Sequence, residues 1–209
     1  MYLFARTSTA DAKRGMDALA FSIDICGRVK SITGQDVSAW TVLYGAPITT
    51  VTWTTRVEGH ATLGAMNEKL QADAGYMAAT AEAAELFTGA PEDSLIEMLA
   101  LVGTGSGAGN YASLVTAQCA DGKIADAMAW GVDILNHVHE LTGRDGSFSR
   151  SLYGPWATVG WITLADSLEQ IDEGTAKMNA DPTYIEKIEA GAGLFLPGVS
   201  ASRLSQKIA

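Results

Sequence analysis

Gly103-Thr104-Gly105-Ser106-Gly107-Ala108-Gly109 divides the sequence near its midpoint, and the residues after this segment repeat the residues before it. The matching stretches are Thr33-Gly34 with Thr142-Gly143 and Tyr44-Gly45 with Tyr153-Gly154, and then Thr50-Val51-Thr52-Trp53 with Thr158-Val159-Gly160-Trp161. The first two pairs lie 109 residues apart and the third lies 108 apart, so one deletion separates the copies. The chain is therefore an internal duplication.

The repeat predicts two halves of similar size. Residues 1–102 form the first repeat, 103–109 a glycine-rich linker and 110–209 the second repeat. The linker lacks both the dinucleotide-binding pattern and the Gly-Lys-Ser/Thr ending of a P-loop, so we expect it to connect the halves without binding phosphate.

Composition excludes several classes of protein. A net charge of −10 and a pI near 4.6 argue against a nucleic-acid partner and against an anionic membrane surface. The hydrophobic content of 47% is sufficient for a sizeable core, yet no apolar run reaches the length of a membrane span. Two cysteines form neither a disulfide framework nor a zinc spacing, and no signal peptide is recognisable. We expect a cytoplasmic protein.

Hydrophobic periodicity gives the same order of elements in both halves: strand, helix, two-stranded hairpin, interrupted helix and strand. In the first half these are 2–9, 11–32, 37–44, 48–57, 60–87 and 95–102. In the second half they are 111–118, 121–141, 148–153, 156–164, 167–180, 182–190 and 200–208. Asp181-Pro182 accounts for the interruption, because proline ends one helix and suits the first turn of another.

The order β-α-β-β-α-β is typical of a ferredoxin-like unit with both helices on one face of its sheet. Two such sheets can cover each other and form an eight-stranded barrel with room for side chains or one small ligand. Here the chain resembles the dimeric α+β barrel superfamily, with two repeats fused. The resemblance implies an α+β fold of two tandem ferredoxin-like repeats forming a pseudo-dimeric barrel. Antibiotic-biosynthesis monooxygenases and haem-degrading monooxygenases belong to this superfamily.

Aromatic residues on or beside the hairpins are the first candidates for a ligand site. Trp40, Tyr44 and Tyr153 would line an apolar pocket if they face the barrel interior. The alternative is that they belong to the core between sheet and helices, which we favour for Trp53 and Trp161. Ser149 replaces Trp40 in the second repeat, and this asymmetry fits a single site in one half.

Two arginines are the polar candidates. Arg56 continues a face of Thr50, Thr52 and Thr54 along its strand, and Arg6 lies on the first strand. This face is either a polar lumen or a solvated sheet surface. An arginine buried there would need a carboxylate from Glu97 or from an acidic ligand.

Histidines offer one weak route to a cofactor. His60, at the start of the interrupted helix, is the haem candidate, although a surface or capping role suits it better. His137 and His139 lie on opposite sides of one helix and cannot share a metal. We expect no metal and no cofactor, with haem as the alternative.

The function that these features favour is binding of a small apolar or aromatic molecule in the barrel, as in a cofactor-independent monooxygenase. Haem handling is one alternative, and a non-enzymatic ligand-binding protein or oligomeric scaffold is another. The first helices share a stripe that is either a solvated face with one partly covered ring, the interpretation that we favour, or a contact surface of a homo-oligomer; it contains Asp17, Phe21, Asp24 and Arg28, repeated as Asp126, Trp130, Asp133 and His137. Whether the chain is an enzyme stays open.

Overall fold

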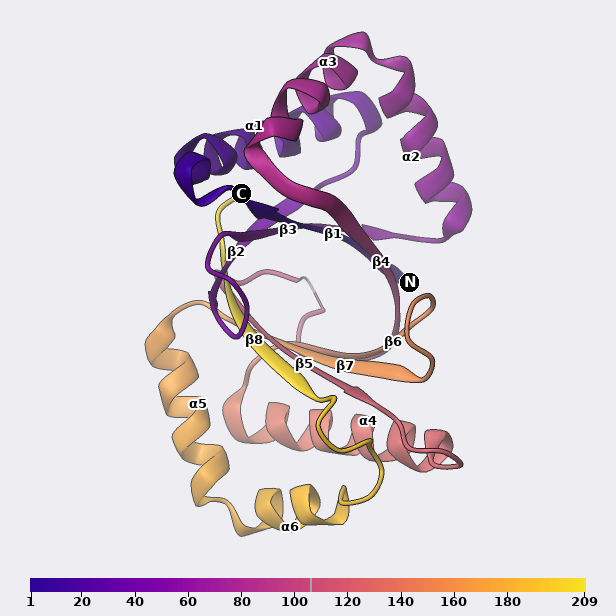
Figure 1. Cartoon of the computed structure of the whole chain (residues 1–209). Coiled ribbons are helices and arrows are strands. Elements are labelled where there is room, and N and C mark those ends of the chain that lie inside the picture. Colours follow the sequence, from indigo (N-terminus) through magenta and orange to yellow (C-terminus); the bar gives the residue numbers. More distant parts are fainter. Residues whose placement is uncertain (106) are drawn as a thin grey trace. The chain divides into compact units, whose positions relative to one another are not determined.

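The structure is a computed structural model that describes residues 1–105 and 107–209 (Figure 1). Ser106, within the expected linker, lies outside the described residues. The first repeat contains β1 (Tyr2–Ala10), the 3-10 turn Ala12–Arg14, α1 (Gly15–Thr33), β2 (Ser38–Tyr44), β3 (Thr50–Val57), α2 (His60–Ala72), α3 (Ala74–Ala83), the 3-10 turn Ala84–Leu86 and β4 (Phe87–Val102). The second contains β5 (Tyr111–Gln118), α4 (Ile124–Thr142), β6 (Gly146–Ser151), β7 (Thr158–Ala165), α5 (Leu168–Ala180), α6 (Pro182–Ala190) and β8 (Ala201–Lys207).

The strands form a closed barrel in the order β1-β3-β2-β8-β5-β7-β6-β4. Read around the ring, each repeat contributes the ferredoxin-like order: β4-β1-β3-β2 from the first and β8-β5-β7-β6 from the second. The pairs β1–β3, β2–β3, β5–β7 and β6–β7 are all antiparallel. This architecture confirms the predicted fold class, the α+β barrel built from two tandem repeats.

Two compact units do not coincide with the two repeats. The first unit contains residues 1–96 and 206–209, and the second contains residues 97–205. The carboxyl-terminal end joins the first unit because Ile208 donates its backbone N–H to the carbonyl of Ala39, at 2.8 Å, and Ala39 donates to Ala209, at 3.0 Å. The boundaries between the compact units thus fall within β4 and within β8, whereas the boundary between the sequence repeats is the linker 103–109.

The interruption of the second helix in each repeat has one cause. Asp73 caps α3 by accepting the N–H of Tyr76 at 2.7 Å, and Asp181 caps α6 by accepting the N–H of Tyr184 at 2.6 Å. An aspartate at this position satisfies a backbone donor that has no partner inside the new helix. The break predicted from Asp181-Pro182 is confirmed, and it is the same in both repeats.

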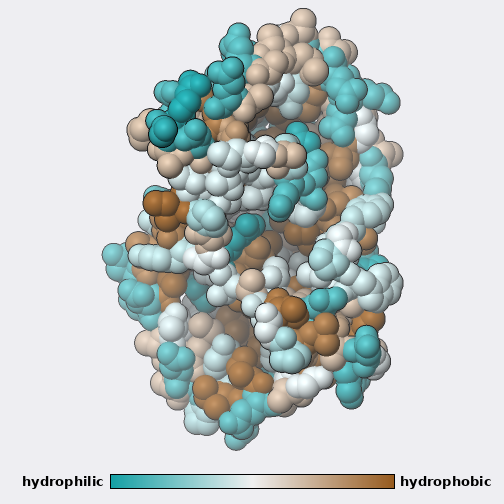
Figure 2. All heavy atoms as spheres, viewed as in Figure 1, coloured by the Kyte–Doolittle hydropathy of each residue, from teal (hydrophilic) through white to brown (hydrophobic). Residues whose placement is uncertain are grey.

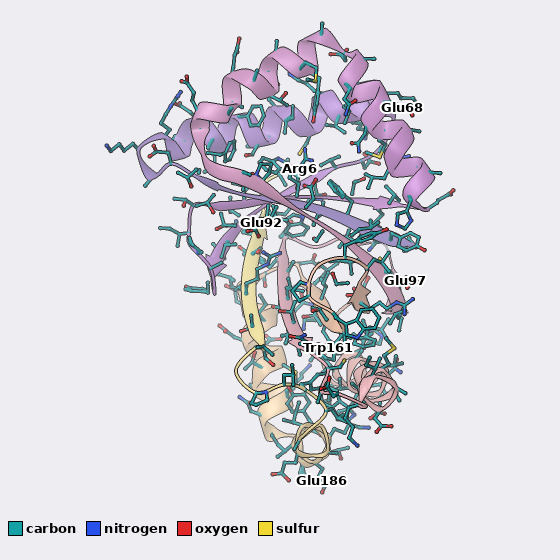
Figure 3. The ribbon with its side chains drawn as sticks, turned by 45° about the vertical axis from the view of Figure 1, so that its right-hand side comes forward. Arg6, Glu68, Glu92, Glu97, Trp161 and Glu186 are labelled. Carbon is teal, nitrogen blue, oxygen red and sulfur yellow. The ribbon has the colours of Figure 1, made fainter. Side chains whose placement is uncertain are left out.

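One tryptophan in each repeat fixes the helices to the sheet. The indole N–H of Trp53 on β3 donates to the carbonyl of Ser22 in α1 at 3.2 Å, and Trp161 on β7 donates to Gly131 in α4 at 2.9 Å. Figure 3 labels Trp161 on this side of its sheet. Both side chains therefore belong to the helix-facing core, as the sequence favours. The opposite side of each sheet is called the helix-free face below.

β4 begins earlier than the sequence predicts, at Phe87 instead of residue 95. Gly89 and Pro91 in this stretch disfavour a strand locally. The stretch is nevertheless extended because it runs beside β1, where the Thr88 hydroxyl donates to the carbonyl of Thr9 at 3.1 Å. A neighbouring strand, rather than local propensity, determines this part of the fold.

Candidate functional site

The helix-free face of the first sheet carries Trp40 among hydroxyl groups. Trp40 is 9% exposed, and its indole N–H donates to the Thr54 hydroxyl at 3.0 Å. Thr52, opposite Trp40 in the register, shares a hydrogen bond with Thr7 at 3.1 Å. Lys207 lies 6.0 Å from the centre of the Trp40 ring. Trp40 is thus held in one orientation, on the same face as the threonines.

The two candidate arginines lie on opposite faces of this sheet. Arg56 alternates with Trp53 along β3 and therefore lies on the helix-free face. Arg6 pairs with Trp53 in the register and lies on the face that carries the helices (Figure 3). The structure therefore does not bring Arg6 to Trp40, because one residue of register reverses the face.

The carboxylate that balances Arg6 is Asp93, with two bonds of 2.7 Å, and not Glu97. Hydrogen bonding to Asp93 is the main cause of the raised pKa of Arg6. Glu97 instead accepts from Arg150 at 2.6 Å. Arg6 therefore takes its carboxylate from an earlier residue of β4 than Glu97, on the face that carries the helices.

The other candidates lie at the surface. Tyr44 is 70% exposed at the end of β2, and Tyr153 is 64% exposed after β6. His60 is exposed at the first residue of α2, where its ring meets Tyr2 edge-on at 5.7 Å. Within the first unit, Tyr44 and His60 are thus exposed side chains at the ends of their elements, and Tyr153 is an exposed side chain of the second unit.

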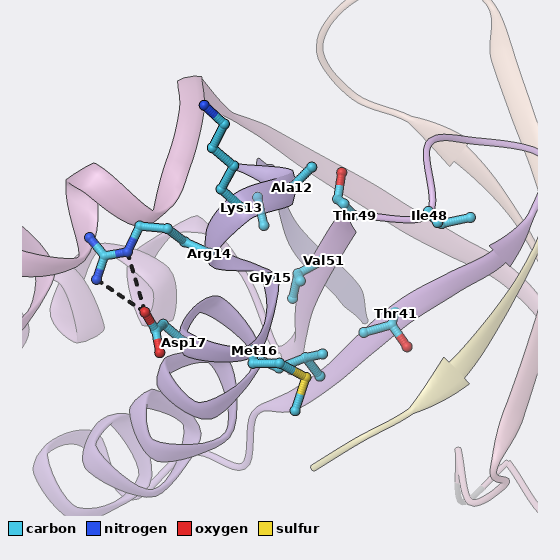
Figure 4. A pocket seen from close by; sticks show the side chains of 12 residues that line it. Ala12, Lys13, Arg14, Gly15, Met16, Asp17, Thr41, Ile48, Thr49 and Val51 are labelled. Atoms are coloured by element: carbon cyan, nitrogen blue, oxygen red, sulfur yellow. Dashed lines mark hydrogen bonds and ion pairs between the residues drawn. The ribbon is translucent and has the colours of Figure 1, made fainter.

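A pocket of about 330 Å³ lies in the first unit at the start of α1 (Figure 4). We call it the α1 pocket. Its wall contains Val51, which is 2% exposed, together with Leu19 and the strongly exposed side chains Met16 and Ile48. Other exposed apolar residues occur elsewhere on the protein, and Figure 2 shows hydrophobic patches among the hydrophilic residues of the face in view. Thr41 and Thr49 add two hydroxyl groups to the lining.

Polar groups at the edge of the α1 pocket are largely satisfied within the chain. Asp11 accepts the N–H of Lys13 through its side chain at 2.8 Å and the N–H of Arg14 through its carbonyl at 2.9 Å. The Arg14 guanidinium lies 3.2 Å from Asp17 and 3.9 Å from Glu85. Asp11 thus satisfies the amides of Lys13 and Arg14 in the turn before α1, and Asp17 and Glu85 balance the Arg14 charge, while Val51, Leu19, Met16 and Ile48 supply the apolar part of the lining.

In the second unit, the helical stripe contacts other residues of the same chain. Trp130 donates its indole N–H to the carbonyl of Lys187 in α6 at 2.7 Å and meets Phe195 edge-on at 5.5 Å. His137 lies 3.1 Å from Asp181. These contacts join α4 to α6, so this part of the stripe packs against its own chain.

No group of three potential metal ligands occurs in the ranges 1–105 and 107–209. Burial raises the pKa of the Cys26 thiol to about 11, and Cys119 is buried as well. Neither cysteine has the lowered pKa of a reactive thiol. Within the same ranges, no helix combines the length and hydropathy that a membrane crossing requires.

Neither the α1 pocket nor the buried Arg144 is predicted from the sequence. Met16 lies in α1 and Ile48 in the turn between β2 and β3, and no sequence spacing relates them before the fold is known. Arg144 follows α4 and is 5% exposed. Comparison of the repeats does single out this position, because the first half has the neutral Gln35 where the second has the charged Arg144.

Comparison with known proteins supports the fold. No protein-family model and no curated protein matches the sequence significantly. Among solved structures, a proposed monooxygenase from Fusobacterium nucleatum aligns with a TM-score of 0.74 at 6% identity, over 100% of this chain and 92% of that one. An anthrone oxidase-like protein aligns with a TM-score of 0.66 at 14% identity, over 100% of this chain and 91% of that one. A haem-degrading enzyme from Listeria monocytogenes aligns with a TM-score of 0.50 at 11% identity, over 99% of each chain.

These identities are too low to transfer an activity, and they bear on the fold alone. The first two alignments nevertheless cover all of this chain and more than nine-tenths of each neighbour. The chain shares with these solved structures the fold of an eight-stranded α+β barrel, here built from two fused ferredoxin-like repeats.

Proposed function

We propose that the chain binds a small, mainly apolar or aromatic molecule, and that the α1 pocket holds it. The observation that carries this proposal is the pocket itself, with a volume of about 330 Å³ and an apolar wall. Ligand sites are typically concave, roughly 300–1,000 Å³ in volume and mostly apolar, with a few polar groups that orient the ligand. This pocket has room for a molecule of one or two rings.

Two features of the α1 pocket favour an apolar ligand over a charged one. Met16 and Ile48 are 80% and 77% exposed, so a ligand that covers them removes apolar surface from water. Asp17 and Glu85 balance the charge of Arg14, which lowers its attraction for an anion. Thr41 and Thr49 remain to orient one hydroxyl or carbonyl group of the ligand.

Replacing two apolar side chains tests this site. In Met16→Asp/Ile48→Asp, we expect binding of 2-naphthol, measured by calorimetry, to weaken at least about tenfold, because the ligand loses apolar contacts and meets two charges. Both residues are exposed, so the fold should persist. The matched control is Ile185→Asp/Ile188→Asp, which changes two exposed residues of α6 and should bind like the parent protein. Equal weakening in both variants would contradict the assignment.

A second candidate site is the helix-free face around Trp40. The fixed indole, the threonine hydroxyls and Arg56 together suit an aromatic ligand with one polar group. The similarity to a proposed monooxygenase and to an anthrone oxidase-like protein makes cofactor-independent oxidation of an aromatic ligand the chemistry to test here. A Trp40→Phe variant removes the indole N–H but retains an aromatic ring. Weaker binding of 2-naphthol in this variant alone would favour the Trp40 face over the α1 pocket.

Haem is the alternative cofactor, and His60 is its candidate ligand. The Listeria neighbour is a haem-degrading enzyme. His60 is exposed, however, and a porphyrin bound through it would lie largely in water, where its apolar rim gains little. We therefore derive no step through haem. In a haemin titration we expect the Soret absorbance of His60→Ala to match that of the parent protein; a band lost in this variant alone would contradict that expectation.

The cytoplasm remains the proposed compartment. Its support is the pair of free, buried thiols, Cys26 and Cys119, since disulfides are rare in reducing compartments.

A further inference from the structure

The second unit buries a guanidinium that has no carboxylate partner. Arg144 is 5% exposed, and its Nε atom is buried without a hydrogen-bond partner. No Asp or Glu of the described chain forms an ion pair with it. Its backbone is satisfied, because its N–H donates to the Thr142 hydroxyl at 3.2 Å and its carbonyl lies 2.8 Å from Nδ1 of His139. Within the side chain, Nε is a buried donor without a partner.

An unpaired buried charge is expensive. Removing an ion from water is unfavourable unless an opposite charge or hydrogen bonds replace the water. Burial accordingly lowers the pKa of Arg144 from its usual value. The contrast lies within the same chain, where Arg6, though less buried, has two bonds of 2.7 Å to Asp93. Arg144 therefore lacks a carboxylate partner, although the more exposed Arg6 has one.

The first repeat demonstrates that the fold does not need an arginine at this place. Gln35 occupies the aligned position after α1, and its N–H donates to the Thr33 hydroxyl at 3.1 Å. Arg144 and Thr142 repeat this turn with nearly the same distance, 3.2 Å. The turn therefore forms equally well with the neutral Gln35, so the positive charge of Arg144 is not needed to form it.

A second substitution accompanies the first. α2 and α5 align residue by residue, and Gly174 of α5 corresponds to Met66 of α2, which is 6% exposed. A Cβ atom at Gly174 would lie 3.4 Å from Cζ and Nε of Arg144. The guanidinium thus lies against a glycine, at the position where the first repeat has a methionine side chain. The pair Gln35 and Met66 has become Arg144 and Gly174.

We propose that Arg144 binds a small oxyanion, the carboxylate or phosphoryl group of a ligand, at the end of α4 where α5 and α6 meet it. A guanidinium matches such groups with two parallel hydrogen bonds. Tyr184 of α6 lies in the same electrostatic neighbourhood, since the charge of Arg144 lowers its pKa against the effect of burial. Its hydroxyl is the second donor that we assign to the anion. This site belongs to the second unit and is independent of the α1 pocket.

Anion-dependent stability tests the proposal. Thermal unfolding is followed at constant ionic strength while inorganic phosphate, or in a second series acetate, replaces chloride. A ligand that binds only the folded state raises the melting temperature in a saturable manner. Because phosphate stabilises most proteins through general effects, the readout is the difference between the parent protein and Arg144→Gln. We expect a saturable rise of several degrees in the parent that Arg144→Gln lacks. The series with the larger rise identifies a phosphoryl or a carboxylate ligand.

Two further variants separate binding from folding. Arg144→Gln/Gly174→Met copies the pair found in the first repeat and should fold well, yet it should not respond to either anion. Arg150→Gln removes an exposed arginine that already has a carboxylate partner, Glu97, and should respond like the parent protein. A direct readout is the ¹⁵N–¹H signal of the Arg144 Nε group, which should shift on addition of the stabilising anion. An equal melting response in the parent and Arg144→Gln, or an unchanged Nε signal, would overturn the proposal.

Discussion

Replacing Phe148 by alanine should lower the free energy of unfolding by about 3–5 kcal/mol, the range typical of deleting a buried phenylalanine ring. Phe148 is 0% exposed and belongs to the buried cluster of the second unit with Leu135 and Val159. Its ring centre lies 5.1 Å from that of Trp161. The loss comprises the transfer of the ring to water and the cavity that remains between α4 and the sheet.

Urea unfolding followed by tryptophan fluorescence measures this loss. Trp130 and Trp161 report on the surroundings of Phe148, because both belong to the same aromatic cluster. Ile185→Ala is the control, since Ile185 is 42% exposed and its truncation should cost little. A loss below about 1 kcal/mol for Phe148→Ala would contradict the core as described.

Replacing Gly131 by alanine should also destabilise the protein, by about 1–3 kcal/mol. Alanine favours a helix over glycine by roughly 1 kcal/mol, so propensity alone predicts the opposite sign. A Cβ atom at Gly131, however, would lie 2.5 Å from two ring atoms of Phe148. The ring cannot retreat because Trp161 packs against it, and the steric cost therefore exceeds the gain in propensity.

A double-mutant cycle isolates that steric cost. In the Phe148→Ala background the ring is absent, and Gly131→Ala should then become neutral or stabilising in the same urea experiment. The first repeat supports this expectation, because Ser22 and Ala39 occupy the aligned positions: a side chain on the helix faces a small residue on the strand. An identical loss in both backgrounds would exclude the contact as its cause.

The sequence predicts the architecture well for a physical reason. Each repeat alternates between periods of 2 and 3.6 residues, and the second copy checks every assignment made on the first. Trp53 and Trp161 were expected in the helix-facing core, and both donate to a helix carbonyl there. The early start of β4 could not be predicted, since Gly89 and Pro91 disfavour a strand until β1 lies beside them.

The candidate site was less predictable, because it depends on register and on contacts between distant residues. Arg6 and Trp40 were grouped together, but a strand alternates its faces, and the pairing of Arg6 with Trp53 sends Arg6 to the helices. Met16 and Ile48 line a common pocket only after α1 packs beside β2 and β3. Comparison of the repeats could have singled out Arg144, whereas its burial without a carboxylate required the structure.

A crystal structure of the protein soaked with 2-naphthol distinguishes the two candidate positions in the first unit. We expect density for the ring system in the α1 pocket, against Met16, Ile48 and Val51, with its hydroxyl toward Thr41 or Thr49. Density beside Trp40 with an empty α1 pocket, or no density at either position at saturating ligand, would contradict this expectation.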